Sequence, residues 1–117
     1  MLLKVRDAQK AVLGADSSRA LLVAHARAAH AEAVKALGDA QLKRVVDEVV
    51  RRCVEYGVAT TREQLRLMDL ALVFGLDWQS AETSWLDAIL SDRREPDATI
   101  RVRKAWRTAL RRLASSL

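Results

Sequence analysis

One amphipathic repeat constrains the fold of this chain more than any other sequence feature. Between residues 42 and 54, apolar side chains recur at the three- and four-residue steps of a single helical face: Leu42, Val45, Val46, Val49, Val50, Cys53 and Val54. The intervening positions carry mostly charged residues. The spacing predicts a helix over Asp39–Tyr56 that buries one face against other elements. Asp39 is the expected N-cap and Gly57 the expected C-terminal stop.

The chain on either side of this repeat also predicts helices. An alanine-rich run predicts one helix over Arg19–Leu37, because alanine has the highest helix propensity. Overlapping capping boxes at Thr60 and Thr61 open another helix that ends at Phe74. Its second half, from residue 67, carries Asp69 as its single charge, so we expect this helix to be the most buried element.

Shorter or later helices complete the expected bundle. They are predicted over residues 2–13, over Trp85–Leu90 and over about Asp97–Ala114, where Pro96 suits the first turn. The connections are short, which is typical of a compact bundle. The sequence therefore predicts an all-α fold of five or six helices in one domain over residues 1–117, with a basic C-terminal helix at about 97–114.

Composition narrows the possible location. Half of the 117 residues are hydrophobic and 30% are charged, as in globular proteins. No segment approaches the roughly 20 apolar residues that span a bilayer, and no apolar leader is visible near the start. The single cysteine cannot form an intramolecular disulfide. We expect a cytoplasmic protein.

Few residues suggest chemistry. His25 and His30 are five residues apart, so on a continuous helix their side chains diverge by about 140°, and no metal site is expected. Cys53 lies on the apolar face, where it needs no role beyond packing. Asp69 resembles a functional carboxylate in an apolar setting, but a structural role with a hydrogen-bond partner such as an arginine or tyrosine is the favoured interpretation.

The sequence contains no phosphate-binding glycine loop and no nucleophile elbow, so neither enzyme activity nor a cofactor is expected.

The last helix carries the strongest surface signal. Residues 93–117 have a formal charge of +6, whereas residues 1–92 have −1. The candidate partner-binding residues are Arg101, Arg103, Lys104, Arg107, Arg111 and Arg112. Three interpretations stay open: a solvated face, docking to an acidic protein surface, and binding to phosphates of nucleic acid or an anionic membrane. Trp106 lies on the apolar stripe of the same helix.

Several short segments, taken in order, resemble a group of small helical proteins encoded beside the spike and effector genes of bacterial type VI secretion systems. The segments are Arg6–Gln9, Leu37–Leu42, Tyr56–Val58, Leu67–Leu70, Phe74–Trp78 and Trp85–Leu90, and together they extend over roughly residues 5–92. The resemblance implies an accessory role toward a secreted toxin, as an adaptor, a chaperone-like companion or an immunity partner. It implies no catalytic residues.

The functional expectation is therefore a non-enzymatic protein-binding factor whose partner is a type VI effector or spike component. Two alternatives remain open. One is a nucleic-acid-binding protein that uses residues 93–112. The other is a homo-oligomeric structural module that buries the alanine-rich face of residues 19–37 against a second copy.

Overall fold

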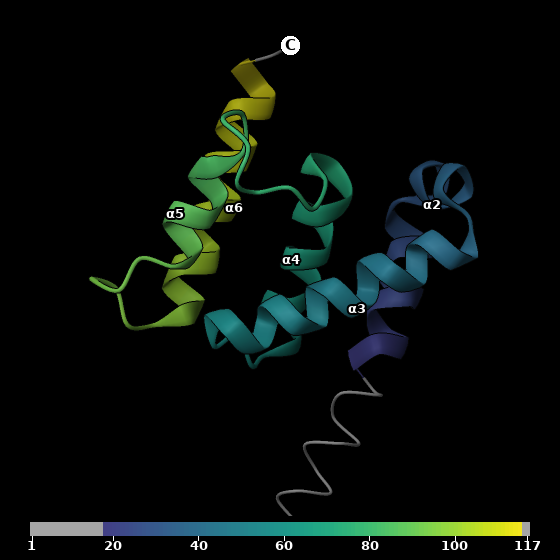
Figure 1. Ribbon diagram of the computed structural model, residues 1–117, viewed down its shortest axis with the longest axis horizontal. Coiled ribbons are helices and arrows are strands. Elements are labelled where there is room, and N and C mark those ends of the chain that lie inside the picture. Colours follow the sequence, from purple (N-terminus) through teal and green to yellow (C-terminus); the bar gives the residue numbers. More distant parts are fainter. Residues whose placement is uncertain (1–17, 116–117) are drawn as a thin grey trace, which may run out of the picture.

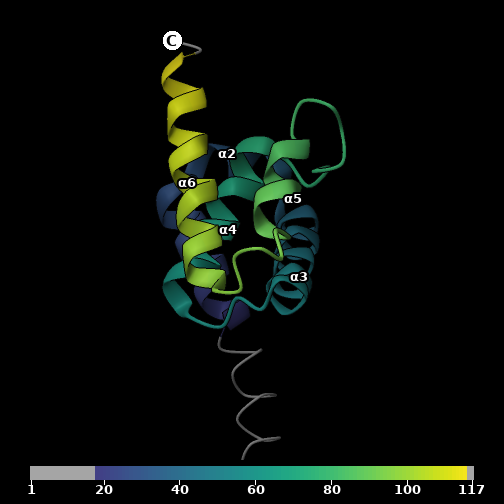
Figure 2. The ribbon, with the colours of Figure 1, turned by 90° about the vertical axis from the view of Figure 1, so that its left-hand side faces the viewer.

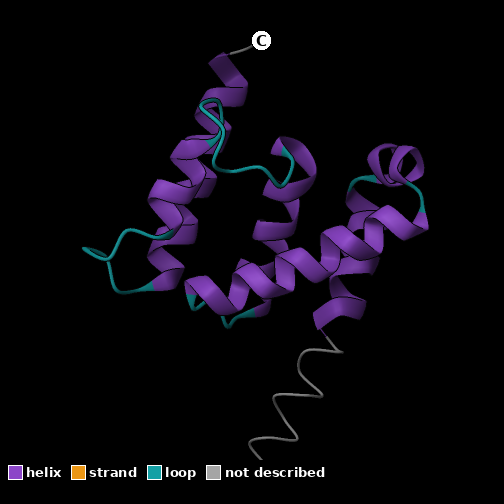
Figure 3. Ribbon diagram, in the orientation of Figure 1, coloured by secondary structure: helices purple, strands orange, loops and turns teal. Residues whose placement is uncertain are grey.

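The computed structural model describes residues 18–115, and all regular secondary structure in this range is helical (Figure 3). The all-α prediction is therefore confirmed. The helix expected over residues 2–13 lies outside the described residues. The first described helix spans residues 18–29, and it is followed by α2 (Ala31–Leu37), α3 (Asp39–Tyr56), α4 (Thr61–Phe74), α5 (Ser84–Leu90) and α6 (Ala98–Ser115).

Helix α3 has the bounds that its repeat predicts, with two differences in detail. Its buried residues are Leu42, Val46, Val49 and Cys53, whereas Val54 is 79% exposed. Gly57 ends the helix in the left-handed conformation, with φ of 73°, which glycine adopts without steric cost. The prediction of Asp39 as N-cap is wrong, because Gly38 occupies that position and Asp39 is the first helical residue.

Helix α4 is the centre of the packing, as its sequence predicts. It contacts α3 on one side and α6 on the other, and α5 packs on α6 (Figure 1). Leu67 and Met68 are fully buried, and Leu70 is 2% exposed. Thr60 is the N-cap, but its side chain makes no cap hydrogen bond, and Thr61 is the first helical residue rather than a cap, so neither predicted capping box forms. Glu63 is instead buried, at 7% exposure.

The alanine-rich helix is not continuous, and this is the main correction to the sequence prediction. His30 has φ of −130° and ψ of 45°, so the chain leaves helical geometry between residue 29 and α2. The amide of His30 still donates to the Ala26 carbonyl, and the His30 carbonyl accepts from the Val34 amide. The backbone therefore bends at His30 while its hydrogen bonds are kept, which limits the cost of the break.

The C-terminal turns of α6 extend past the neighbouring helices (Figures 1 and 2). The N-terminal and middle turns bury Val102, Ala105 and Ala109. Leu110 and Leu113 continue the helical spacing of these buried residues, but they are 52% and 40% exposed. Both line a groove that α6 shares with Val73 and Phe74 of α4.

Truncating the centre of α4 should test this packing. We expect Leu67→Ala to lower the free energy of unfolding by about 3 kcal/mol, since a fully buried leucine leaves a cavity. The matched control is Val54→Ala on the exposed side of α3, which should change it by less than about 0.5 kcal/mol. Urea denaturation followed by circular dichroism measures both. Equal effects would contradict the central position of Leu67.

Alkaline pH should weaken the fold through Cys53. Burial raises the pKa of this thiol from 9.0 to about 12, so it is not a reactive thiolate at neutral pH. The unfolded chain releases the proton above about pH 9 while the folded chain keeps it. Stability should therefore fall by about 1.4 kcal/mol per pH unit between the two pKa values.

The control for this pH dependence is Cys53→Val, which keeps an apolar side chain of similar size. Burial also raises the pKa of Tyr56, but that residue is present in both proteins. Urea denaturation at about pH 8 and at about pH 11 should show a smaller loss of stability in the valine variant. An identical loss would show that Cys53 ionises freely in the folded protein.

Candidate functional site

Two histidines and one aspartate meet where the bend at His30 faces α4. His25 Nε2 lies 2.6 Å from Asp69 Oδ1, and His30 Nε2 lies 2.7 Å from the same oxygen. Since a carboxylate can only accept, both imidazoles donate to it when no other ligand is bound. The three side chains are 28%, 20% and 16% exposed, respectively. We call His25, His30 and Asp69 the His–Asp cluster.

The cluster overturns two sequence interpretations. The divergence of about 140° assumed a continuous helix, and the break at His30 removes that assumption. The arginine or tyrosine partner expected for Asp69 is also wrong, because its partners are the two histidines. Asp69 therefore places a carboxylate oxygen beside both histidines. The three ligand atoms lie within 4.8 Å of one another.

A shallow apolar groove begins at the cluster and runs between α4 and α6. Its cavity volume is about 200 Å³. The residues that line it are Ala29, His30, Asp69, Leu70, Val73, Phe74, Trp106, Ala109, Leu110 and Leu113. Val73 and Leu110 are about half exposed, at 47% and 52%. The two side chains therefore present apolar surface to solvent from both helices that form the groove.

The structure divides the six predicted partner-binding residues into two groups. Arg101 serves the fold, because its Nη2 donates to the Tyr56 carbonyl at the end of α3, at 2.5 Å. Arg112 lies over the Trp85 ring, 4.5 Å from the ring centroid, and so joins α6 to α5. Arg112 is nevertheless exposed, as are the other four residues, and we call these four the basic face: Arg103, Lys104, Arg107 and Arg111.

The basic face borders the apolar groove. Arg103 and Arg107 precede Leu110 by seven and three residues, so all three lie on one side of α6. No acidic residue occurs between residues 98 and 115. The groove is therefore flanked along α6 by positive charge alone. Arg66 of α4 also lies near it, 5.4 Å from the centroid of the Trp106 ring.

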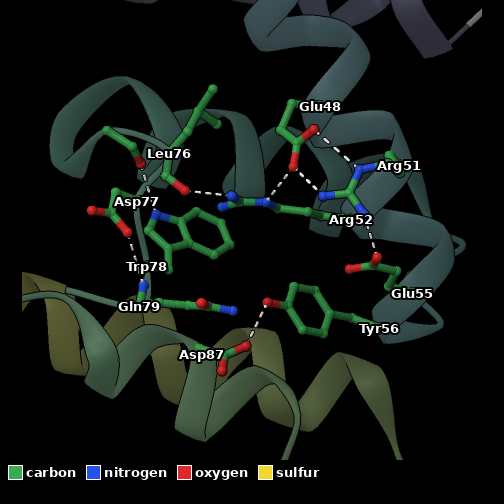
Figure 4. Close-up of polar contacts among 11 residues, drawn as sticks. Glu48, Arg51, Arg52, Glu55, Tyr56, Leu76, Asp77, Trp78, Gln79 and Asp87 are labelled. Atoms are coloured by element: carbon green, nitrogen blue, oxygen red, sulfur yellow. Dashed lines mark hydrogen bonds and ion pairs between the residues drawn. The ribbon is translucent and has the colours of Figure 1, made fainter.

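A separate polar network connects α3, the 75–83 connection and α5 (Figure 4). The Arg52 guanidinium lies 4.3 Å from the centroid of Trp78, and its Nε donates to Glu48 at 3.1 Å. Arg52 also donates to the Leu76 carbonyl. Tyr56 donates to Asp87 at 3.0 Å. These contacts hold the connection against α3, so we interpret the network as structural.

A second apolar groove lies between helix 18–29 and α3. Its cavity volume is about 550 Å³, and its floor includes Val23, Leu42 and Val46. Charged residues of both helices border it, including Arg27 and Asp39, whose side chains lie 3.6 Å apart. This is the alanine-rich face that the homo-oligomer alternative requires.

Sequence reasoning found the members of the His–Asp cluster one by one but did not bring them together. A signal was present: a lone acid in an apolar helix needs a polar partner, and a histidine can supply the N–H group from which a carboxylate accepts. The spacing of apolar residues in the sequence does not predict the bend at His30. The cluster forms between segments that are 39 and 44 residues apart.

Comparisons with known proteins do not identify a family for this chain. No protein-family model, curated protein or solved structure matches the chain. Within residues 18–115, none of the helices combines the length and the apolar character needed to cross a bilayer. The function must therefore be inferred from the groove, the basic face and the cluster.

Proposed function

We propose that this chain is a non-enzymatic protein-binding accessory factor, and that its partner docks on the apolar groove between α4 and α6. The observation that carries the proposal is the exposure of Val73 and Leu110 beside the basic face. Apolar contact supplies affinity, while the adjacent arginines select a partner with carboxylates around its apolar anchors. The occupant we propose is an amphipathic acidic helix, since a shallow groove between two helices suits this recognition mode.

The resemblance to accessory proteins of type VI secretion suggests where such a partner is found. On that basis the acidic segment belongs to a secreted effector or a spike component, and the chain acts as adaptor, chaperone-like companion or immunity partner. The groove and the basic face support protein docking in general. The adaptor and immunity roles would use the same interface, and they differ in whether the bound toxin keeps its activity.

The basic face should be required for this binding. Reversing Arg103, Arg107 and Arg111 to Glu places negative charge where the partner's carboxylates dock, so we expect affinity to fall by about 100-fold or more. Isothermal titration calorimetry against the effector and spike proteins encoded beside the gene measures it. The matched control reverses three exposed cations on other helices, Lys35, Arg44 and Arg62. Unchanged affinity in the α6 variant would reduce the basic face to a solvated surface.

The groove itself is tested by Leu110→Asp, which places a charge among apolar contacts without opening a cavity in the core. We expect a loss of at least about 10-fold in affinity, with helicity by circular dichroism unchanged. Val54→Asp on the exposed side of α3 is the control, because it adds the same charge at another exposed apolar position. Equal losses in both variants would point to net charge rather than to the groove.

The nucleic-acid alternative keeps one supporting observation, which is the row of exposed cations on α6. Salt dependence separates it from protein docking. Binding to duplex DNA should weaken log-linearly with salt, with a slope near −0.9 per neutralised phosphate. Binding through a groove with an apolar centre should be much less sensitive to salt.

Light scattering at two protein concentrations tests the homo-oligomer alternative directly.

A further inference from the structure

We propose that His25, His30 and Asp69 bind a divalent transition-metal ion, with Zn²⁺ as the ion that these ligands suit best. This goes beyond the proposed protein-binding function and does not depend on it. Two imidazole nitrogens and one carboxylate oxygen converge on one point from two separate regions of the chain. No other part of residues 18–115 brings three potential metal ligands of this kind together.

The ligand types select the class of metal. Imidazole nitrogen suits Zn²⁺, Cu²⁺, Ni²⁺ and Fe²⁺, whereas Mg²⁺ and Ca²⁺ prefer sites made of oxygen ligands alone. Two histidines and one carboxylate are also a known ligand set for zinc. Cys53, the single thiol of the chain, is buried with its pKa raised to about 12 and so stays protonated.

The three ligand atoms lie close enough together for one ion to contact all of them after a small outward shift of the imidazoles. Zinc lies about 2.0–2.1 Å from each nitrogen or oxygen ligand, which separates neighbouring ligand atoms by about 3.3 Å. The two Nε2–Oδ1 distances are 2.6 and 2.7 Å, so each imidazole needs to withdraw by roughly 0.6 Å to admit the ion. The imidazole planes meet at 69° with centroids 6.1 Å apart. Both rings can therefore bind one ion from different directions.

The backbone at His30 is what makes convergence possible. On an unbroken helix the side chains of His25 and His30 would diverge. The non-helical φ and ψ of His30 turn its ring toward the oxygen that His25 also meets. An ion bound here would link helix 18–29 and the bend that follows it to α4, whose Asp69 is 44 and 39 residues from His25 and His30. Binding should therefore stabilise the folded chain.

The site is accessible, and its coordination is incomplete. All three side chains are partly exposed, so an ion can enter from solvent. Three protein ligands leave a fourth tetrahedral position for water or another exchangeable ligand. His30 and Asp69 also line the apolar groove, so this position is close to the surface on which we expect a partner to dock.

The competing explanation is structural. In that case Asp69 accepts two hydrogen bonds, and the histidines satisfy a carboxylate that the apolar helix would otherwise leave without partners. This explanation predicts no specific ion binding. Metal titration of the full chain distinguishes the two.

The first experiment is a calorimetric titration of the untagged full chain with ZnCl₂. We expect one ion per chain with micromolar or tighter affinity, and an increase in melting temperature on the order of 10 °C at about 100-fold excess over the dissociation constant. His25→Gln, His30→Gln and Asp69→Asn should each lower the affinity by about 100-fold. Gln and Asn keep hydrogen-bonding groups at these positions. Asp39→Asn removes an exposed acid outside the cluster and should bind like the parent.

A second measurement uses the unsubstituted chain, so it does not depend on whether the variants fold. The chain has two histidines, so its imidazole nitrogen NMR spectrum contains two side-chain spin systems. Both should shift together and saturate at one equivalent of Zn²⁺. Co²⁺ should give the strong visible absorption of a tetrahedral complex with nitrogen ligands. Absence of saturable binding, a shift of one histidine alone, or equal affinity in all cluster variants would overturn the proposal.

Discussion

Enclosure of α4 is the constraint on which the rest of the structure depends. A helix that is apolar on nearly all sides cannot rest on one neighbour, because any uncovered side would leave apolar surface in water. Helices α3 and α6 cover α4 from two directions, and each has an apolar face of its own to bury. Helix α5 then packs on α6. The arrangement follows from one element that has to be surrounded.

Asp69 is the exception within that central helix, and its position has consequences for its surroundings. A carboxylate at this depth needs polar partners, and it finds them in the two histidines of a segment that would otherwise be a plain alanine-rich helix. Two charge-assisted hydrogen bonds are worth a few kcal/mol at most, about the scale of one local backbone distortion. The bend at His30 and the cluster therefore support each other. The same residues border the groove, so the two surfaces that could carry function are adjacent.

The basic α6 shows why a charge pattern alone is ambiguous. Its cations look equivalent in sequence. In the structure, however, Arg101 donates to the Tyr56 carbonyl at the end of α3, and Arg112 packs on Trp85. Only their contacts with other helices distinguish these two from the other cations of α6, such as Arg103 and Arg107 beside the groove. The same holds for Leu110 and Leu113, whose period matches that of buried residues. They are instead partly exposed, because they line the groove beside Val73 and Phe74 of α4.

Local sequence was sufficient for most of the helices, because apolar spacing, propensity and helix-ending glycines act over a few residues. The bounds of α3, the end of α4 at Gly75 and the short α5 follow from such signals within about one residue. The bend at His30, the partners of Asp69 and the division of the α6 arginines depend on residues tens of positions away. The spacing of residues along the sequence does not report such contacts, because they form only when the helices pack together. The elements of this protein were thus determined locally, whereas its candidate sites were decided by tertiary structure.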